Sequence, residues 1–392
     1  MDMEKSSWQI ASRRLFVATG LLLAGLAQGA TNLVILPSQI TLTGPEARQQ
    51  LIIEQVKDKQ FQGQFTNAVE FVSSDTTVVR IENGAAVPVT NGAATISVKS
   101  GKLSASAPVL VSGMEKSFDW SFRNHIQPVL AKNGCSAGAC HGAAAGQNGF
   151  KLSLRGYDDD GDYLALTHGA LGRRIVPSDP GRSLMLLKPT GAVPHKGGKR
   201  FDVDSLDYRI IAQWIAAGTP GPKADDPRIT RIEVLPQRVI LSPAASQQLN
   251  VRAFFDDGHS EDVTRWAKYT SANETVCQID EHGLAKVVGF GEGAITAWYL
   301  SRIDIASIAV PFTNTINPKS FAEAKRRNFI DELVLDKLKS LNLPPSPRCT
   351  DEEFLRRAFL DAAGILPTAQ ETREFIADKS SSKRDKLIES LL

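Results

Sequence analysis

The sequence of 392 residues has little cysteine, almost no net charge and a single long apolar run. Four cysteines are too few for an exported scaffold that depends on disulfides. The formal charge of +2, from 45 basic and 43 acidic residues, favours neither nucleic acid nor an anionic membrane as partner. With 42% hydrophobic and 22% charged residues, the chain is typical of a folded protein of several domains.

The apolar run lies near the N-terminus. Residues 15–27 are apolar, follow Arg13 and Arg14, and lead into small residues at 27–30. The run is shorter than the ~20 residues of a membrane-spanning helix. This pattern predicts a signal peptide over residues 1–30, with an uncleaved membrane anchor as the competing interpretation. We therefore expect an exported protein, periplasmic or on the cell surface, with no transmembrane span in the mature chain.

Two segments about 200 residues apart repeat each other. Residues 33–37 match 232–236, and residues 49–51 match 247–249. In both copies, short runs rich in Val, Ile and Thr alternate with turn signals, as in a small antiparallel sandwich. The copies resemble the bacterial Ig-like group 2 family. The resemblance predicts Ig-like domains over residues 31–113 and 221–313.

The residues between the repeats have helical patterns instead. Apolar residues of 118–130 have helical spacing, although Pro128 should kink or shorten that helix. Residues 203–217 place their apolar side chains on one helical face, with Asp202 or Asp204 as the expected N-cap. The stretch between them is rich in glycine. We therefore expect helix, loop-rich middle and helix over residues 114–220.

The loop-rich middle contains a candidate haem-attachment motif. Cys135 and Cys140 are followed at once by His141, although four residues separate the cysteines instead of the usual two. In such a motif the thiols add to the haem vinyl groups and the histidine binds the iron. The alternatives are a local disulfide, a zinc site that includes His141, and a pair of structural cysteines.

Residues around this motif resemble the planctomycete-type cytochrome c family. The segments that carry the resemblance are 122–130, 140–142, 146–154 and 215–218, within a region of about 118–220. The resemblance implies one covalent haem c, held by Cys135 and Cys140, with His141 as the proximal iron ligand. The wider spacing of the cysteines departs from the family and bears on whether both thioether bonds form.

The distal iron ligand is a separate question. Family members often carry a Met-Pro-Pro segment before the closing helix, where this chain has His195 and no methionine. His195 is therefore the first choice and Met185 the second, followed by His168 or an open position. A solvated loop histidine and a core methionine are the competing interpretations for the first two. Two histidine ligands would give a lower reduction potential than a His/Met pair.

Other candidate sites are weaker. The acidic run of residues 158–162 does not fit an EF-hand, so we interpret it as a solvated turn more readily than as a calcium site. Cys277 aligns with Val79 of the first repeat, which predicts a buried strand position.

The last 80 residues are helical in pattern. Residues 329–338, 351–363 and 369–377 are amphipathic, and the region 314–392 resembles the start of a domain of unknown function that accompanies such cytochrome modules. A truncated chain is the expectation here.

Together these patterns predict a multidomain protein. Two all-β Ig-like sandwiches flank an all-α cytochrome-c-like domain, and a helical segment follows. We expect electron transfer or redox coupling with an unidentified redox partner protein. The alternative is a cell-surface interaction protein that binds polysaccharide or protein through its Ig-like domains; a third possibility is a non-catalytic enzyme subunit. No catalytic constellation is visible, so the sequence assigns no enzyme activity.

Overall fold

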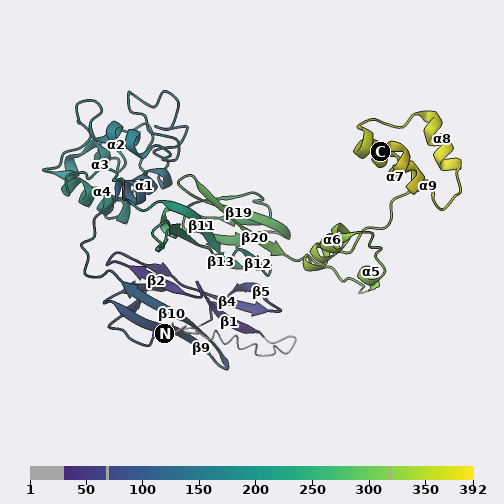
Figure 1. Ribbon diagram of the computed structural model, residues 1–392, viewed down its shortest axis with the longest axis horizontal. Helices are drawn as coiled ribbons and strands as arrows, with labels where there is room; N and C mark the ends of the chain where they lie inside the picture. The colour runs from purple at the N-terminus through teal and green to yellow at the C-terminus, as the bar shows by residue number, and fades with distance from the viewer. Residues whose placement is uncertain (1–30, 68–69, 318) are drawn as a thin grey trace, which may run out of the picture.

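The computed structural model describes residues 31–67, 70–317 and 319–392. The protein is multidomain, with mostly β structure and some helices (Figure 1). The expected signal peptide, residues 1–30, lies outside the described residues. No helix of the described ranges is long and apolar enough to cross a membrane.

Two β units have the same strand order. The first β unit contains β1 (Asn32–Leu36), β2 (Ile40–Thr43), β3 (Gln49–Gln50), β4 (Ile52–Lys57), β5 (Gln60–Gln64), β6 (Phe71–Ser73), β7 (Val79–Glu82), β8 (Ala85–Pro88), β9 (Gly92–Ser100) and β10 (Leu103–Ser112). The second β unit contains β11 (Ile229–Leu235), β12 (Arg238–Ile240), β13 (Ser246–Gln248), β14 (Asn250–Phe255), β15 (Ser260–Asp262), β16 (Lys268–Ser271), β17 (Cys277–Ile279), β18 (Leu284–Val287), β19 (Gly291–Tyr299) and β20 (Arg302–Val310).

Pairing within the two units also corresponds. In the first unit β1, β4 and β5 are neighbours, β2 runs parallel to β10 beside β9 and β6, and β8 lies between β3 and β7. The second unit repeats this with β11–β14–β15, with β12 parallel to β20 beside β19 and β16, and with β13–β18–β17. Alternating buried and exposed residues along β9 and β19 place one face of each strand on the core. The internal repeat is therefore a repeat of structure. Cys277, at the start of β17, is fully buried as expected.

The two β units meet edge to edge through equivalent residues. β5 pairs with β12 at Phe61 and Val239, which joins strands of both units into one seven-stranded sheet. The Gln50 backbone N–H donates to Asp262 Oδ2 at 2.6 Å, and the Gln248 backbone N–H donates to Gln64 Oε1 at 2.9 Å. The two donors, Gln50 and Gln248, occupy equivalent positions in the two repeats. Each unit therefore makes the same kind of contact to the other. The interface thus has approximate two-fold symmetry.

A helical unit lies between the β units in sequence and packs against the second (Figure 1). Its helical segments are a π-helical turn (Phe122–Ile126), α1 (Gln127–Lys132), α2 (Asp159–Thr167), a 3₁₀ turn (Pro180–Arg182), α3 (Leu184–Leu187) and α4 (Leu206–Ala216). The buried face of α4, with Ile210, Ile211 and Trp214, agrees with the expected face. Its N-cap differs from the expectation: Ser205 accepts from the Tyr208 N–H at 3.2 Å, so neither Asp202 nor Asp204 caps the helix.

Pro128 explains how the helical unit is joined to the second β unit. Proline has no N–H, so the Asn124 carbonyl four residues earlier loses its helical donor. The Tyr299 hydroxyl of β19 donates to that carbonyl at 3.1 Å instead, and Tyr299 is fully buried. The helix is irregular here, because the π turn directly precedes α1, which contains Pro128 near its start.

Replacing Tyr299 with phenylalanine should therefore lower the free energy of unfolding by about 1–3 kcal/mol, because the buried Asn124 carbonyl would be left without a donor. Urea denaturation of the full chain measures this change. Tyr157→Phe is the matched control, since Tyr157 is 72% exposed and should leave stability unchanged. Equal stabilities of Tyr299→Phe and the parent protein would refute this account of the junction.

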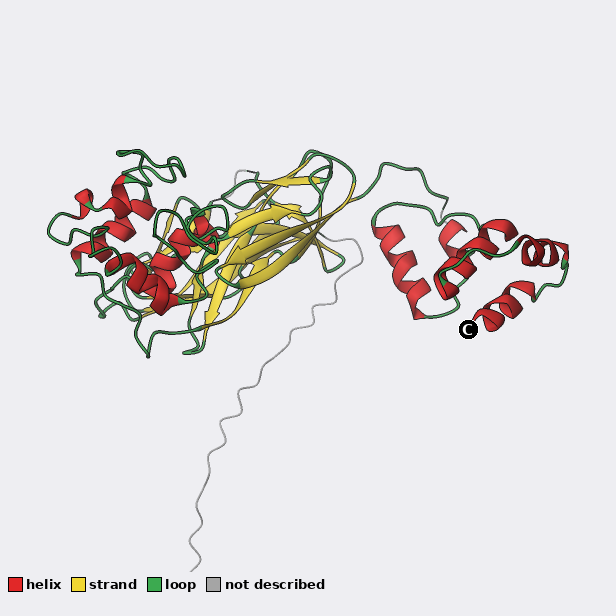
Figure 2. Ribbon diagram, turned by 90° about the horizontal axis from the view of Figure 1, so that it is seen from above, coloured by secondary structure: helices red, strands yellow, loops and turns green. Residues whose placement is uncertain are grey.

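The C-terminal helices lie at the far end of the β units from the helical unit (Figures 1 and 2). They are α5 (Lys319–Ala322), α6 (Phe329–Ser340), α7 (Asp351–Ala363), α8 (Ala369–Ala377) and α9 (Lys383–Leu391). Thr350 and Thr368 form capping boxes at the starts of α7 and α8. Leu355, Phe359 and Phe375 form a small core of their own.

Candidate functional site

The loop from Cys135 to His141 is folded by its own backbone. The Cys140 N–H donates to the Ala137 carbonyl at 2.9 Å, and the His141 N–H donates to the Cys135 carbonyl at 3.0 Å. These turns bring the two ends of the motif together despite the four intervening residues. Gly142 is needed directly afterwards, because a Cβ there would lie 2.1 Å from the Ser136 carbonyl oxygen.

His141 is held in one tautomer by the backbone. Its Nδ1 lies 3.0 Å from the Phe150 carbonyl oxygen, which only accepts hydrogen bonds. Nδ1 must therefore carry the proton, and the Nε2 lone pair of the neutral ring is free to bind a metal. Burial lowers the pKa of His141, and the nearby His195, Arg174 and Lys188 lower it further. The neutral form is the one that ligates a metal.

His195 has the same arrangement on the other side of a cavity. Its Nδ1 lies 3.0 Å from the Gly198 carbonyl oxygen, so its Nε2 is also free. The ring planes of His141 and His195 are nearly parallel, at 9°, and their centroids are 6.4 Å apart.

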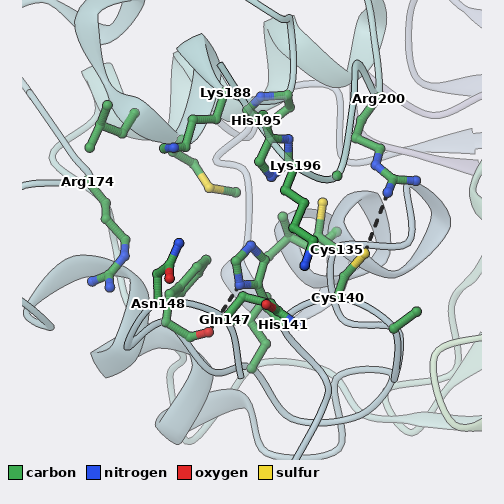
Figure 3. A pocket seen from close by; sticks show the side chains of 18 of the residues that line it. Cys135, Cys140, His141, Gln147, Asn148, Arg174, Lys188, His195, Lys196 and Arg200 are labelled. Carbon is green, nitrogen blue, oxygen red and sulfur yellow. Dashed lines mark hydrogen bonds between the residues drawn. The ribbon is translucent and has the colours of Figure 1, made fainter. Parts of the chain in front are cut away.

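The cavity between them has a volume of about 460 Å³, within the ~300–1,000 Å³ range typical of small-molecule sites. Figure 3 shows Cys135 and Cys140 on one side of His141 and Arg174 on the other. Carbon-rich walls come from Leu130, Phe150, Leu152, Leu184, Met185 and Pro189. The polar lining includes Gln147, Asn148, Arg173, Lys188, Lys196 and Arg200.

The two thiols have different surroundings. Burial raises the pKa of the Cys135 thiol to about 12. Cys140 accepts a long hydrogen bond of 3.5 Å from Arg200 Nη2. Both are free thiols that line the cavity, so no disulfide joins them in this structure. Within the described ranges, no three His, Cys, Asp or Glu side chains are grouped as ligands for a metal ion.

The structure also places the other candidate ligands. Met185 on α3 lines the cavity, is 7% exposed and packs into the core, so its packing role is confirmed and its role as an iron ligand stays a prediction. His168 follows α2, bonds to Thr167, and is not part of the cavity lining. The cavity therefore brings together Cys135, Cys140, His141, His195 and Met185 and leaves His168 outside.

The acidic run proves to be structural. Asp158 caps α2 by accepting from the Gly161 N–H, and Asp159 pairs with Arg123. Asp162 is 4% exposed and accepts hydrogen bonds from Gln127 and from both the backbone and hydroxyl of Ser153. The interpretation of this run as a solvated turn was wrong for Asp162, because that residue faces inward one helical turn after the cap.

Sequence reasoning missed the cations of the cavity. Arg173, Arg174, Lys188, Lys196 and Arg200 all line it, and no Asp or Glu does. The signal available in the sequence was an excess of basic residues over acidic ones within 173–200.

Comparison with known proteins assigns only the C-terminal segment. The family model described as PSCyt2, a protein of unknown function (DUF1549), matches residues 329–392, which contain α6 to α9. No curated protein matches the chain.

Solved structures with detectable likeness include the S-layer protein rSbsC(31-844), at 10% identity and a TM-score of 0.20 over 74% of this chain and 28% of that one. Domains 5–6 of the S-layer protein SbsC give 11% identity and a TM-score of 0.27, covering 71% and 96%. The neural ectodermal development factor IMP-L2 gives 9% and 0.23, covering 72% and 94%. The chain thus spans under a third of rSbsC(31-844), and at these TM-scores the likenesses carry no argument.

Proposed function

We propose that the chain is an exported protein that binds one covalently attached haem c and serves in electron transfer or redox coupling outside the cytoplasm. The main support for this proposal is the pair of parallel histidine rings, His141 and His195, each with a free Nε2. Both rings line one cavity, which is also lined by both cysteines. Carbon-rich walls around them suit a flat macrocycle.

In this proposal each residue has a defined task. Cys135 and Cys140 would hold the haem covalently, and His141 and His195 would ligate its iron. The haem supplies one-electron redox chemistry when bound. The Phe150 and Gly198 carbonyls orient the two imidazoles and raise their basicity. The walls of the cavity limit access of water to the iron, which helps to set its reduction potential.

The test is the absorption spectrum of the full chain, exported from a host with haem-attachment machinery. We expect a Soret band, an α band on reduction, and a haem adduct that survives denaturation. Cys135→Ala with Cys140→Ala should remove the adduct. A purified protein with no Soret band in that host would refute the proposal and favour the surface-interaction alternative.

His195→Ala tests the distal ligand in the same preparation. The ferric spectrum should change from low spin to high spin, because one of two nitrogen ligands is lost. Met185→Leu is the matched control and should leave the spin state unchanged, since leucine preserves the core packing. If Met185→Leu produced the change and His195→Ala did not, the distal ligand would be Met185.

A further inference from the structure

The candidate haem cavity carries positive charge that nothing in the described parts of the chain neutralises. Five cations line it, and no carboxylate does. Within residues 31–67, 70–317 and 319–392, none of Arg173, Arg174, Lys188, Lys196 and Arg200 belongs to an ion pair. Of the five, Arg174 is buried, and a charge removed from water without a charged partner is unfavourable, so this cavity suits an anionic ligand.

Arg174 is the best positioned of these cations. It is 7% exposed, and its Nη1 donates to the Ala165 and Gly169 carbonyls at 3.0 and 2.7 Å. Its guanidinium lies over the Phe150 ring, 4.4 Å from the centroid. Phe150 is also the residue whose carbonyl orients His141. The guanidinium is therefore fixed relative to the proximal histidine, while only neutral carbonyls accept its hydrogen bonds.

The positions of the substituents on haem indicate which side of the cavity the anionic groups of a bound haem would occupy. The vinyl groups that react with cysteines and the two propionate carboxylates lie at opposite edges of the macrocycle. Cys135 and Cys140 define the vinyl edge. In Figure 3, Arg174 lies on the other side of His141 from these cysteines, whereas Arg200 lies beside Cys140.

We propose that Arg174, assisted by Lys188, binds the carboxylates of the ligand at the edge of the cavity opposite the cysteines. This inference rests on the proposed haem site. It adds the orientation of the haem within the cavity and the preference of the cavity for an anionic ligand. Arg174 Nη1 donates to two carbonyls and Nη2 to the Gly149 carbonyl at 3.4 Å, which leaves Nε and one Nη2 proton for a carboxylate. Lys188 supplies a second positive charge from the end of α3. Arg200, on the cysteine side, has no carboxylate to bind.

The test uses the full chain with Cys135→Ala and Cys140→Ala, so that binding is reversible. Iron-free protoporphyrin IX and its dimethyl ester are titrated under the same solvent conditions and followed by porphyrin fluorescence. The diacid should bind at least about tenfold more tightly than the diester, equivalent to about 1.4 kcal/mol. Arg174→Leu should abolish that preference. Arg200→Leu should change both affinities in parallel and keep their ratio.

Lys188→Met provides a second variant in case Arg174→Leu does not fold, and it should reduce the preference severalfold. Equal binding of diacid and diester by the parent would overturn the inference. So would a preference that neither Arg174→Leu nor Lys188→Met reduces. Failure of both porphyrins to bind any variant would also overturn the inference. None of these results decides the haem proposal, which stands or falls on the Soret band of the exported parent protein.

Discussion

Asp162→Ala should lower the free energy of unfolding of the helical unit by about 3–5 kcal/mol, the largest single-residue effect expected here. The carboxylate accepts from the Ser153 backbone, the Ser153 hydroxyl and Gln127 Nε2. Ser153 and Gln127 are 6% and 2% exposed, so water cannot replace the lost acceptor. Urea denaturation of the full chain, followed by tryptophan fluorescence, measures the loss.

The Asp162→Ala substitution should also disturb the candidate haem site. Leu152, next to Ser153, donates its backbone N–H to the His141 carbonyl at 2.8 Å, and the Phe150 carbonyl orients the His141 ring. Asp160→Ala is the matched control: Asp160 is exposed in the same acidic run, and its loss should cost less than about 1 kcal/mol. If the two variants lowered the free energy of unfolding by similar amounts, the hydrogen bonds of Asp162 would not stabilise the helical unit as we expect.

Asp162 shows what a sequence pattern does and does not contain. Composition identifies 158–162 as acidic, and acidic runs are usually solvated. The helical period carried the missing information, because Leu166, one turn later, is fully buried on the same face as Asp162. A carboxylate on a buried face needs hydrogen-bond donors, and those of Asp162 come from outside α2: from Gln127, 35 residues away, and from Ser153, nine residues away.

The candidate site was only partly visible in the sequence for a similar reason. Cys135, Cys140 and His141 are contiguous enough to form a motif, and the place of His195 before α4 marked it as a ligand candidate. The structure adds that both rings hydrogen-bond to backbone carbonyls, which no residue pattern encodes. Arg174 lines the cavity from a loop, and its position depends on the Ala165 carbonyl of α2, on the Gly169 carbonyl after it and on the Phe150 ring.

The internal repeat was predictable, but its consequence was not. Matching residues at 49–51 and 247–249 indicated two equivalent β units. Nothing in that match says that the two copies bind each other through these same residues. The structure shows that they do, with Gln50 and Gln248 each donating a backbone N–H to the other unit. Edge strands that each unit exposes alone are covered in the pair.

One buried acid in this interface makes its stability depend on pH. Glu54 on β4 is fully buried, and its Oε1 accepts from Gln247 Nε2 of the other β unit. Glu54 Oε2 and Gln247 Oε1 are both buried without a partner. A proton on Oε2 would let the acid donate to the amide oxygen, which satisfies both atoms. Burial raises the pKa of Glu54 from 4.5 to about 7, and the Gln247 hydrogen bond offsets part of that rise.

The direction of the pH effect follows from these values. Because the pKa of Glu54 is higher in the folded protein than in the unfolded chain, its contribution to stability is complete below about pH 4.5 and is lost as the pH rises through 7. The difference corresponds to a loss on the order of 3 kcal/mol by pH 9. In Glu54→Gln the side chain is neutral at every pH and its amide can donate to Gln247 Oε1, so this loss should disappear.

The measurement is urea denaturation of the full chain at pH 5, 7 and 9, with the parent compared to Glu54→Gln at each pH so that all other titrating groups cancel. The variant should match the parent at pH 5 and exceed it at pH 9. Glu82→Gln is the control, because the Glu82 side chain is 50% exposed in the same β unit and should leave the pH dependence unchanged. A constant difference between Glu54→Gln and the parent from pH 5 to 9 would mean that Glu54 is ionised throughout, and the proton-linked contact between the β units would have to be abandoned.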